Sequence, residues 1–214
     1  MKLTVNAFIT LDGVMQGPGG ADEDPTGGFT RGGWLVPYVD EGFGEVVDQW
    51  FAAGDAVLLG RTTYDLMSGF WPEVTDPEDT TAAALNGRSK YVVSNTLTEP
   101  GWGNTIVVSG DAVEQVRALK EELGEGELQV HGSAQLAAAL HEAGLVDEYR
   151  LLVFPVCVGE GKRLFQGHGP GMGFEVVESR TTPAGVTYLN LRPTAFRSGV
   201  VELIDGKDTV QTDA

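Results

Sequence analysis

The sequence predicts an α/β protein built on an eight-stranded sheet that is mostly parallel and has an antiparallel C-terminal edge. Through the first 150 residues, short apolar runs typical of strands alternate with helical patterns, and this alternation is typical of a parallel sheet. The last three strand-like runs have no helical pattern between them, and "TTPAG" at 181–185 has the composition of a hairpin turn. The sheet is therefore expected to finish antiparallel.

Composition indicates one ordinary globular domain. The chain has 214 residues, of which 42% are hydrophobic and 21% charged, enough for a single large core. No internal repeat or Ser/Pro-rich linker divides it, so we expect one domain over 1–195. The remainder, 196–214, becomes polar towards its end and is expected to be an extension that frays or adds a strand at a partner surface.

The chain is strongly acidic, with 14 Lys and Arg against 31 Asp and Glu and a formal net charge of -17. A field of that sign repels nucleic acids and acidic membranes, so neither is an expected partner. No apolar run approaches the roughly 20 residues of a membrane span, and the opening residues lack a signal-peptide pattern. The single cysteine, Cys157, is expected in the core and permits no intrachain disulfide. A cytoplasmic protein is expected.

Strands and helices are assigned from their apolar spacing. Asp111 and Ser133 are suitable helix N-caps, and Gly144 is a suitable helix stop. The strand-like runs are 2–9, 56–60, 90–94, 105–109, 127–132, 148–158, 174–180 and 186–193. The helical patterns are 38–54, 62–70, 111–123 and 133–144.

The turn after the strand 56–60 has the composition of an anion site. Gly60, Arg61, Thr62 and Thr63 stand where a helix begins and exposes unpaired N–H groups. Arg61 is one of few cations in the chain, and its planar guanidinium suits a phosphate. A glycine after a strand is more often a simple turn, so this turn alone decides nothing.

Two further strand ends repeat the arrangement. Gly132, Ser133 and Ala134 lie between a strand and a helix, and their small side chains permit close approach to the backbone. Polar side chains also follow the strand 90–94, namely Ser94, Asn95 and Thr96. In open α/β sheets, ligands bind outside the carboxyl ends of the strands. The three strand ends together therefore predict a ligand site, although none has the dinucleotide pattern G-x-G-x-x-G.

Five segments, in the right order over residues 2 to 192, resemble the dihydrofolate reductase superfamily. "LLGRTTYDLMSGFWP" resembles its G-R-x-T-[WYF]-[ED] segment, and "KYVVSNTL" and "VHGSAQLAAAL" are similar to the strand and glycine turn that follow. The opening "LTVNAFITLDGVMQG" and the late "VDEYRLLVFPVCVGEGKRLF" are similar to the branch containing the C-terminal reductase domain of bacterial riboflavin biosynthesis proteins.

The resemblance implies a three-layer fold and an NADPH-dependent oxidoreductase that reduces a C=N or C=O bond of a small, heterocyclic compound. It leaves open a substrate like 5-amino-6-(5-phosphoribosylamino)uracil or like dihydrofolate. The residues that it implies for the cofactor are Ala7, Met15, Gly60, Arg61, Thr62, Thr63, Ser94, Asn95, Thr96, Gly132, Ser133, Ala134 and Gln135.

The substrate end needs a closed site and a proton source. The glycine-rich loop 16–33 is expected to close as a lid, and the aromatic residues Phe29, Trp34, Phe70 and Trp71 are expected in the pocket unless they are ordinary core. The resemblance to folate reductases makes Asp40, which follows a Trp and a Pro, the first candidate acid. Asp12 is the second candidate, although an Asp-Gly pair also suits a turn.

Some positions depart from the family pattern. Val14 stands where riboflavin-type reductases often carry a lysine, and no basic pair for a ribose phosphate is evident. Two alternatives therefore stay open, namely a non-catalytic ligand-binding protein on the same fold and a flavin- or deazaflavin-using reductase. The absorbance spectrum and nucleotide binding discriminate between them.

The remaining expectations concern histidines and partners. His131, His141 and His168 show no ligand spacing, so no metal site is expected; His131 lies beside the glycine turn and His141 is expected on a helix surface. The resemblance also implies a homodimer formed through the late strands. The apolar run 149–158 suits such an interface and suits burial within a monomer equally well.

Overall fold

Alternating apolar residues give the central sheet a buried surface on both faces. The structure, a computed structural model, describes residues 1–167, 169 and 171–212. In β1 (Lys2–Thr10), Leu3 and Val5 enter one hydrophobic cluster, whereas Phe8 packs against another. Because successive strand side chains point to opposite faces, the fold must cover the sheet on both sides.

The order of the strands in the main sheet is β4-β3-β2-β5-β1-β6-β8-β7. All neighbours from β4 to β6 pair in parallel, whereas β8 is antiparallel to both β6 and β7. The predicted mostly parallel sheet with an antiparallel C-terminal edge is therefore confirmed. The remaining strands of this sheet are β2 (Ala56–Gly60), β3 (Ser89–Val93), β4 (Thr105–Val108), β5 (Glu127–Val130), β6 (Glu148–Phe154), β7 (Met172–Thr181) and β8 (Thr187–Ala195).

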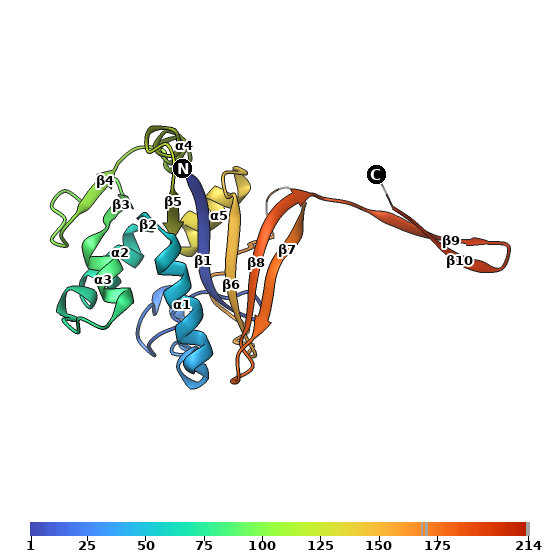
Figure 1. Cartoon of the computed structure of the whole chain (residues 1–214), viewed down its shortest axis with the longest axis horizontal. Helices are drawn as coiled ribbons and strands as arrows, with labels where there is room; N and C mark the ends of the chain where they lie inside the picture. The colour runs from blue at the N-terminus through green and yellow to red at the C-terminus, as the bar shows by residue number, and fades with distance from the viewer. Residues whose placement is uncertain (168, 170, 213–214) are drawn as a thin grey trace.

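Helices cover both faces of the sheet, which gives three layers (Figure 1). One face packs against α4 (Ala112–Glu122) and α5 (Ala134–Glu142), and the other packs against α1 (Glu41–Ala53), α2 (Arg61–Ser68) and α3 (Thr80–Gly87). Short 3-10 turns lie at Thr26–Gly28, Val36–Tyr38 and Trp71–Glu73. None of the helices in the described part of the chain is long and apolar enough to span a bilayer.

Helix ends follow the predicted capping residues. Asp111 accepts hydrogen bonds from the backbone N–H groups of Val113 and Glu114, and Ser133 caps α5 through the Leu136 N–H. Gly144 follows α5 with a φ of 64°, a conformation that favours glycine. These three predictions are confirmed.

Several local predictions are wrong. The predicted strand 148–158 ends at Phe154 because Pro155 has no N–H to continue the ladder, and Cys157 lies exposed in the following loop. His141 is buried, with Nδ1 2.8 Å from the Tyr149 hydroxyl. His168 lies outside the described residues.

The C-terminal extension forms a hairpin that projects away from the domain (Figure 1). Its strands, β9 (Gly199–Ile204) and β10 (Lys207–Thr212), pair antiparallel in a two-stranded sheet of their own. Val201 pairs with Val210, and Leu203 lies on the same face of the hairpin. The exposed fractions of these three residues are 69%, 70% and 79%. We call the hairpin 199–212 the C-terminal arm.

Candidate functional site

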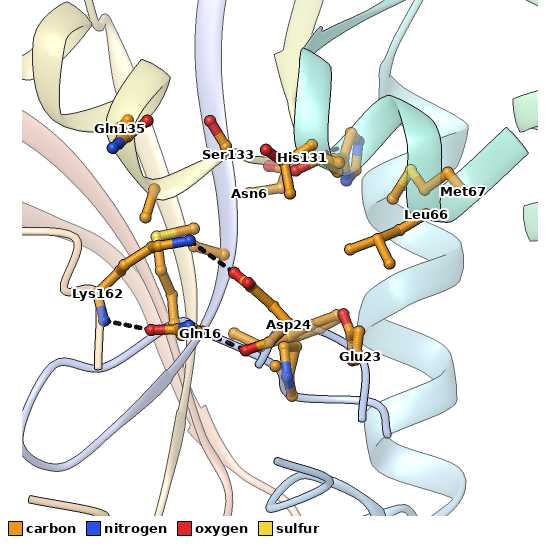
Figure 2. Close-up of a pocket in the computed structure, with 18 of the residues that line it drawn as sticks. Asn6, Gln16, Glu23, Asp24, Leu66, Met67, His131, Ser133, Gln135 and Lys162 are labelled. Atoms are coloured by element: carbon orange, nitrogen blue, oxygen red, sulfur yellow. Dashed lines mark hydrogen bonds and ion pairs between the residues drawn. The ribbon is translucent and has the colours of Figure 1, made fainter. Parts of the chain in front are cut away.

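Two cavities adjoin at the carboxyl end of the central strands, where β1 and β5 end and α2 and α5 begin. We call them the inner cavity, of about 170 Å³, and the outer cavity, of about 680 Å³. Figure 2 shows the inner cavity between two sets of side chains, with Asn6, His131 and Ser133 on one side and the loop residues Glu23 and Asp24 on the other. The site therefore lies at the edge of the sheet that the strand ends predicted.

Seven of the thirteen residues predicted for the cofactor line the inner cavity, whereas Gly60, Arg61, Gly132 and the residues 94–96 do not. The seven are Ala7, Met15, Thr62, Thr63, Ser133, Ala134 and Gln135. Asn6 also lines it and is only 3% exposed, yet its side-chain oxygen has no hydrogen-bond partner. A buried acceptor without a partner is costly unless a ligand supplies a donor. The wall of the inner cavity thus contains a hydrogen-bond acceptor without a partner.

Two glycines allow the strand ends to approach closely. Gly60 donates its N–H to the Gly132 carbonyl at 3.0 Å. A Cβ on Gly60 would stand 2.5 Å from the Ser133 Oγ, and one on Gly132 would stand 2.7 Å from the Thr63 Oγ1. Any larger residue at either position would therefore push the two turns apart, and their N–H groups would no longer converge.

The predicted phosphate-binding residues lie beside the inner cavity, at the start of α2. This helix has no side-chain cap, so its first N–H groups are open to an anion. Arg61 holds Asp65 through Nε at 2.8 Å, and its Nη1 lies 3.4 Å from the Thr96 hydroxyl. Ser94 contacts Thr96, whereas Asn95 hydrogen-bonds Gly110 at the end of β4. The turns after β2 and β3 therefore meet, and the Asn95 side chain is held by Gly110.

The loop 16–33 is an ordered wall of the site. Gln16 donates its side-chain amide to the carbonyls of Asp24 and Thr26, both at 2.9 Å. Lys162 holds Asp24 at 2.8 Å and the Thr26 hydroxyl at 2.7 Å. The Lys162 contacts tie the predicted lid to the segment that follows β6, and Figure 2 shows the contacts that Gln16 and Lys162 make with Asp24.

Glu23 is the carboxylic acid that lines both cavities. Its Oε2 accepts hydrogen bonds from the N–H groups of Gly19 and Gly20. Burial raises the pKa of the Glu23 carboxyl above its ordinary value, and the charge of Asp24 adds to the effect, while the two N–H donors oppose it. A carboxyl with a raised pKa keeps its proton to higher pH, which suits a general acid.

The two predicted acids have structural roles instead. Asp40 caps α1 by accepting the Phe43 N–H at 2.8 Å, and its second oxygen accepts the Ala184 N–H at 2.7 Å. Asp12 accepts the Thr10 hydroxyl at 2.6 Å and the Gly159 N–H at 2.8 Å.

Neither Asp12 nor Asp40 belongs to the lining of the two cavities. The Thr10 hydroxyl lowers the pKa of Asp12, and the Phe43 N–H lowers that of Asp40. A carboxyl with a lowered pKa carries no proton at neutral pH, so both residues are poorly suited to act as acids. In the structure, the carboxylate predicted at Asp40 is a helix N-cap and the one predicted at Asp12 lies in a turn.

Of the four predicted pocket aromatics, Phe70 and Trp71 line the outer cavity. Phe29 and Trp34 do not, because both are buried in the core beside Val14. The Trp34 indole donates to the Gln16 carbonyl at 2.9 Å and thereby holds the loop.

His131 lines both cavities but is a neutral imidazole. Its ring stacks on Phe51 with centroids 4.8 Å apart, and Nε2 lies 3.2 Å from the Gln129 Oε1. Burial lowers the pKa of His131 to about 3, helped by the charges of Arg88 and Arg150. The ring therefore forms a wall and a hydrogen-bonding group and does not supply a proton at neutral pH.

Sequence reasoning missed several lining residues. Leu66 and Met67 lie on the exposed turns of α2 and form the boundary between the cavities. Lys162, Glu23 and Asp24 come from loops, where no periodicity reports which way a side chain points. The sequence did offer one indication of a functional residue, which is Lys162 in "GEGKRLF", because cations are scarce in this chain.

The strand order and a ligand site at the strand ends define a class of α/β proteins with reductase members. The chain belongs to the RibD C-terminal domain family, whose profile matches residues 1–188. The resemblance read from the sequence is thus confirmed at the level of the family.

Individual relatives agree with this assignment. The uncharacterized protein YyaP of Bacillus subtilis is 30% identical over 190 residues, covering 88% of this chain and 93% of that protein. A Shewanella sp. PV-4 structure assigned to riboflavin biosynthesis has a TM-score of 0.63 at 23% identity, covering 91% of this chain and all of the other.

The third relative is a Thermotoga maritima diaminohydroxyphosphoribosylaminopyrimidine deaminase/5-amino-6-(5-phosphoribosylamino)uracil reductase. It has a TM-score of 0.59 at 16% identity, and the match covers 90% of this chain and 56% of that one. At this identity the similarity shows the fold alone.

Proposed function

We propose that the protein is an NADPH-dependent reductase of a C=N or C=O bond in a small, heterocyclic compound. The observation that carries the proposal is that the two cavities adjoin and share lining residues, among them Phe8, Trp50, Leu66, Met67, Glu23 and His131. A ring in the inner cavity would therefore lie next to a ring in the outer one, as a transfer between two bound molecules requires. The named activity of the Thermotoga maritima relative points to the same reaction class.

The residues at the inner cavity fit such a cofactor. Arg61, Thr62 and Thr63 would hold phosphate at the uncapped start of α2. Gly60 and Gly132 let the two turns approach each other closely, and the unpartnered Asn6 oxygen would accept a hydrogen bond from a carboxamide. When bound, the cofactor supplies a hydride.

The chain's own residues would exclude water and provide the proton. Phe8, Trp50 and Met67 line the boundary between the cavities with apolar surface, which keeps water from the reacting atoms. Glu23 lies at the same boundary, and its raised pKa extends its protonated form to higher pH, so it would be the group that donates a proton to the acceptor atom of a substrate. The hydrogen bonds from Gly19 and Gly20 fix the carboxyl in this position.

NADPH binding by wild type and Arg61→Ala tests the proposal. We expect wild type to bind NADPH and Arg61→Ala to bind it more weakly by about 1–3 kcal/mol, the range of a charge-assisted hydrogen bond. Nicotinamide fluorescence measures both affinities, with NADH as the comparison nucleotide. Arg192→Ala is the matched control, because Arg192 is also exposed and paired with a carboxylate, Glu175, but lies on β8.

Other outcomes distinguish the alternatives. If neither nucleotide binds to wild type, the reductase proposal fails and a non-catalytic ligand-binding protein is left. A flavin or deazaflavin user would instead show the absorbance of the bound cofactor after purification. If Arg61→Ala and Arg192→Ala weaken NADPH binding equally, the phosphate-binding site lies elsewhere.

A further inference from the structure

The outer cavity is large, and many of the side chains that line it are aromatic. Its volume is about 680 Å³, and it lies between α1, α2 and the loop that carries Glu23. Aliphatic side chains such as Leu66, Met67 and Leu85 complete the wall. Six aromatic residues line it, namely Phe8, Phe43, Trp50, Phe51, Phe70 and Trp71. Such a surface stacks planar rings and excludes water.

Apart from His131, the ionisable side chains that line the outer cavity in the described part of the chain are acidic. Glu23, Asp48 and Asp79 line it, and no lysine or arginine does so in the part of the chain that the structure describes. Asp48 accepts the Thr80 hydroxyl, and Asp79 caps α3 by accepting the Ala82 N–H at 2.8 Å. His131, the remaining titratable group, is uncharged at neutral pH for the reasons given above.

Among the described residues, the cations around the site do not line the outer cavity. Lys162 lines the inner cavity and is held by Asp24 at 2.8 Å. Arg61, the first residue of α2, lines neither cavity. Arg88 and Arg150, whose charges help to lower the pKa of the lining histidine, do not line the outer cavity either. An anionic group in the outer cavity would therefore lose its hydration and meet carboxylates in place of a counter-charge, an unfavourable exchange.

Taking the proposed reductase as its basis, we propose that the outer cavity takes a planar aromatic compound that is uncharged or cationic and carries no phosphate or carboxylate. Aromatic faces bind planar rings and attract cations, and carboxylates at the rim attract cations further. This class excludes a phosphoribosylaminouracil, the compound in the name of the Thermotoga maritima relative. It also excludes folates with their glutamate carboxylates.

Gly44 offers a way to fill the cavity without disturbing the fold. It lies in α1, lines the outer cavity, and a Cβ built on it meets nothing within 4 Å. A leucine there would enter the cavity and would also improve the helix, since glycine is a poor helix former. Gly87→Leu is the matched control, because Gly87 is an exposed residue of α3 with nothing within 4 Å of its Cβ position.

The experiment uses three probes that share one ring system: 1-naphthylmethanol, 1-naphthylmethylamine and 1-naphthyl phosphate. At neutral pH they are uncharged, cationic and anionic. Calorimetric titration into the full chain is expected to show the alcohol and the amine binding at least about tenfold more tightly than the phosphate. Gly44→Leu is expected to weaken binding of the alcohol by at least about tenfold, and Gly87→Leu is expected to leave this affinity unchanged.

Three results would overturn the proposal. The first is that 1-naphthyl phosphate binds as tightly as the alcohol and is equally sensitive to Gly44→Leu. The second is that neither the alcohol nor the amine binds at millimolar concentration. The third is that Gly44→Leu does not change the affinity for the alcohol. A separate titration with NADPH tests the reductase proposal independently of the proposal about the outer cavity. If NADPH fails to bind while the naphthyl preferences hold, the reductase proposal fails and the cavity assignment stands.

Discussion

At the scale of single residues, the chemistry of the site depends on which carboxyl keeps its proton. Glu23→Gln retains the shape and an oxygen for the Gly19 and Gly20 N–H groups but removes the acid. We expect kcat to fall about 10²–10⁴-fold, the usual contribution of a general acid, with NADPH affinity unchanged. NADPH absorbance, followed with a screened heteroaromatic compound that is turned over, measures the rate.

The pH dependence of the reaction rate tests whether Glu23 acts as an acid. Because burial raises the pKa of Glu23, the protonated form extends to higher pH, and the wild-type rate should fall as pH rises through that pKa. Glu23→Gln should lose this limb. Asp22→Asn, an exposed neighbour in the same loop, is the control and should behave as wild type. Equal losses in the two variants would argue for a disturbed loop and against an acid.

Residue roles were predictable only where one local pattern determined them. Thr62, Thr63 and Ser133 follow directly from strand-to-helix turns, and the structure places them at the inner cavity. Glu23 was not predictable, because a loop has no period from which the direction of a side chain follows. Asp40 was assigned from a motif that a helix cap satisfies equally well, since both require a carboxylate at the start of a helix.

At the scale of elements, Asp40 connects α1 to the turn before β8. Asp40→Ala removes the acceptor for two backbone N–H groups, so we expect Tm to fall by a few degrees while NADPH affinity stays unchanged. Thermal denaturation and the fluorescence titration measure the two quantities. Asp111→Ala is the control for a helix cap alone, because Asp111 bonds only the first turn of α4. A large loss of NADPH binding without a change in Tm would instead indicate that Asp40 belongs to the ligand-binding site.

Elements with a strong period were predicted well, and those without one were missed. The alternation in β1, the continuous apolar run of β2 and the caps of α4 and α5 come from local chemistry. The short α3 lacks an amphipathic pattern and forms through its Asp79 cap and its packing on α1. The C-terminal arm carried an available signal, because its turn is the pair Asp205-Gly206, and Asp-Gly between apolar runs is a strong hairpin signal.

At the scale of the whole molecule, the proposed anionic cofactor would have to bind an acidic protein against the field of that protein. The net charge of -17 repels NADPH at long range, while Arg61 and the start of α2 attract it only nearby. Raising ionic strength from about 0.01 to 0.15 M shortens the screening length from about 30 to 8 Å. We therefore expect the NADPH association rate to rise with salt, as measured by stopped-flow nicotinamide fluorescence. A rate that falls with salt would mean that the local positive potential dominates the encounter.

The C-terminal arm has a consequence for how the molecule moves through water. A thin ribbon that projects from a globular body adds little mass but considerable drag (Figure 1). A monomer would then elute early from a sizing column and resemble a larger particle. The predicted homodimer stays a prediction, and elution volume is a poor way to decide it. Light scattering reports mass independently of friction, so it separates an elongated monomer from a true pair of chains.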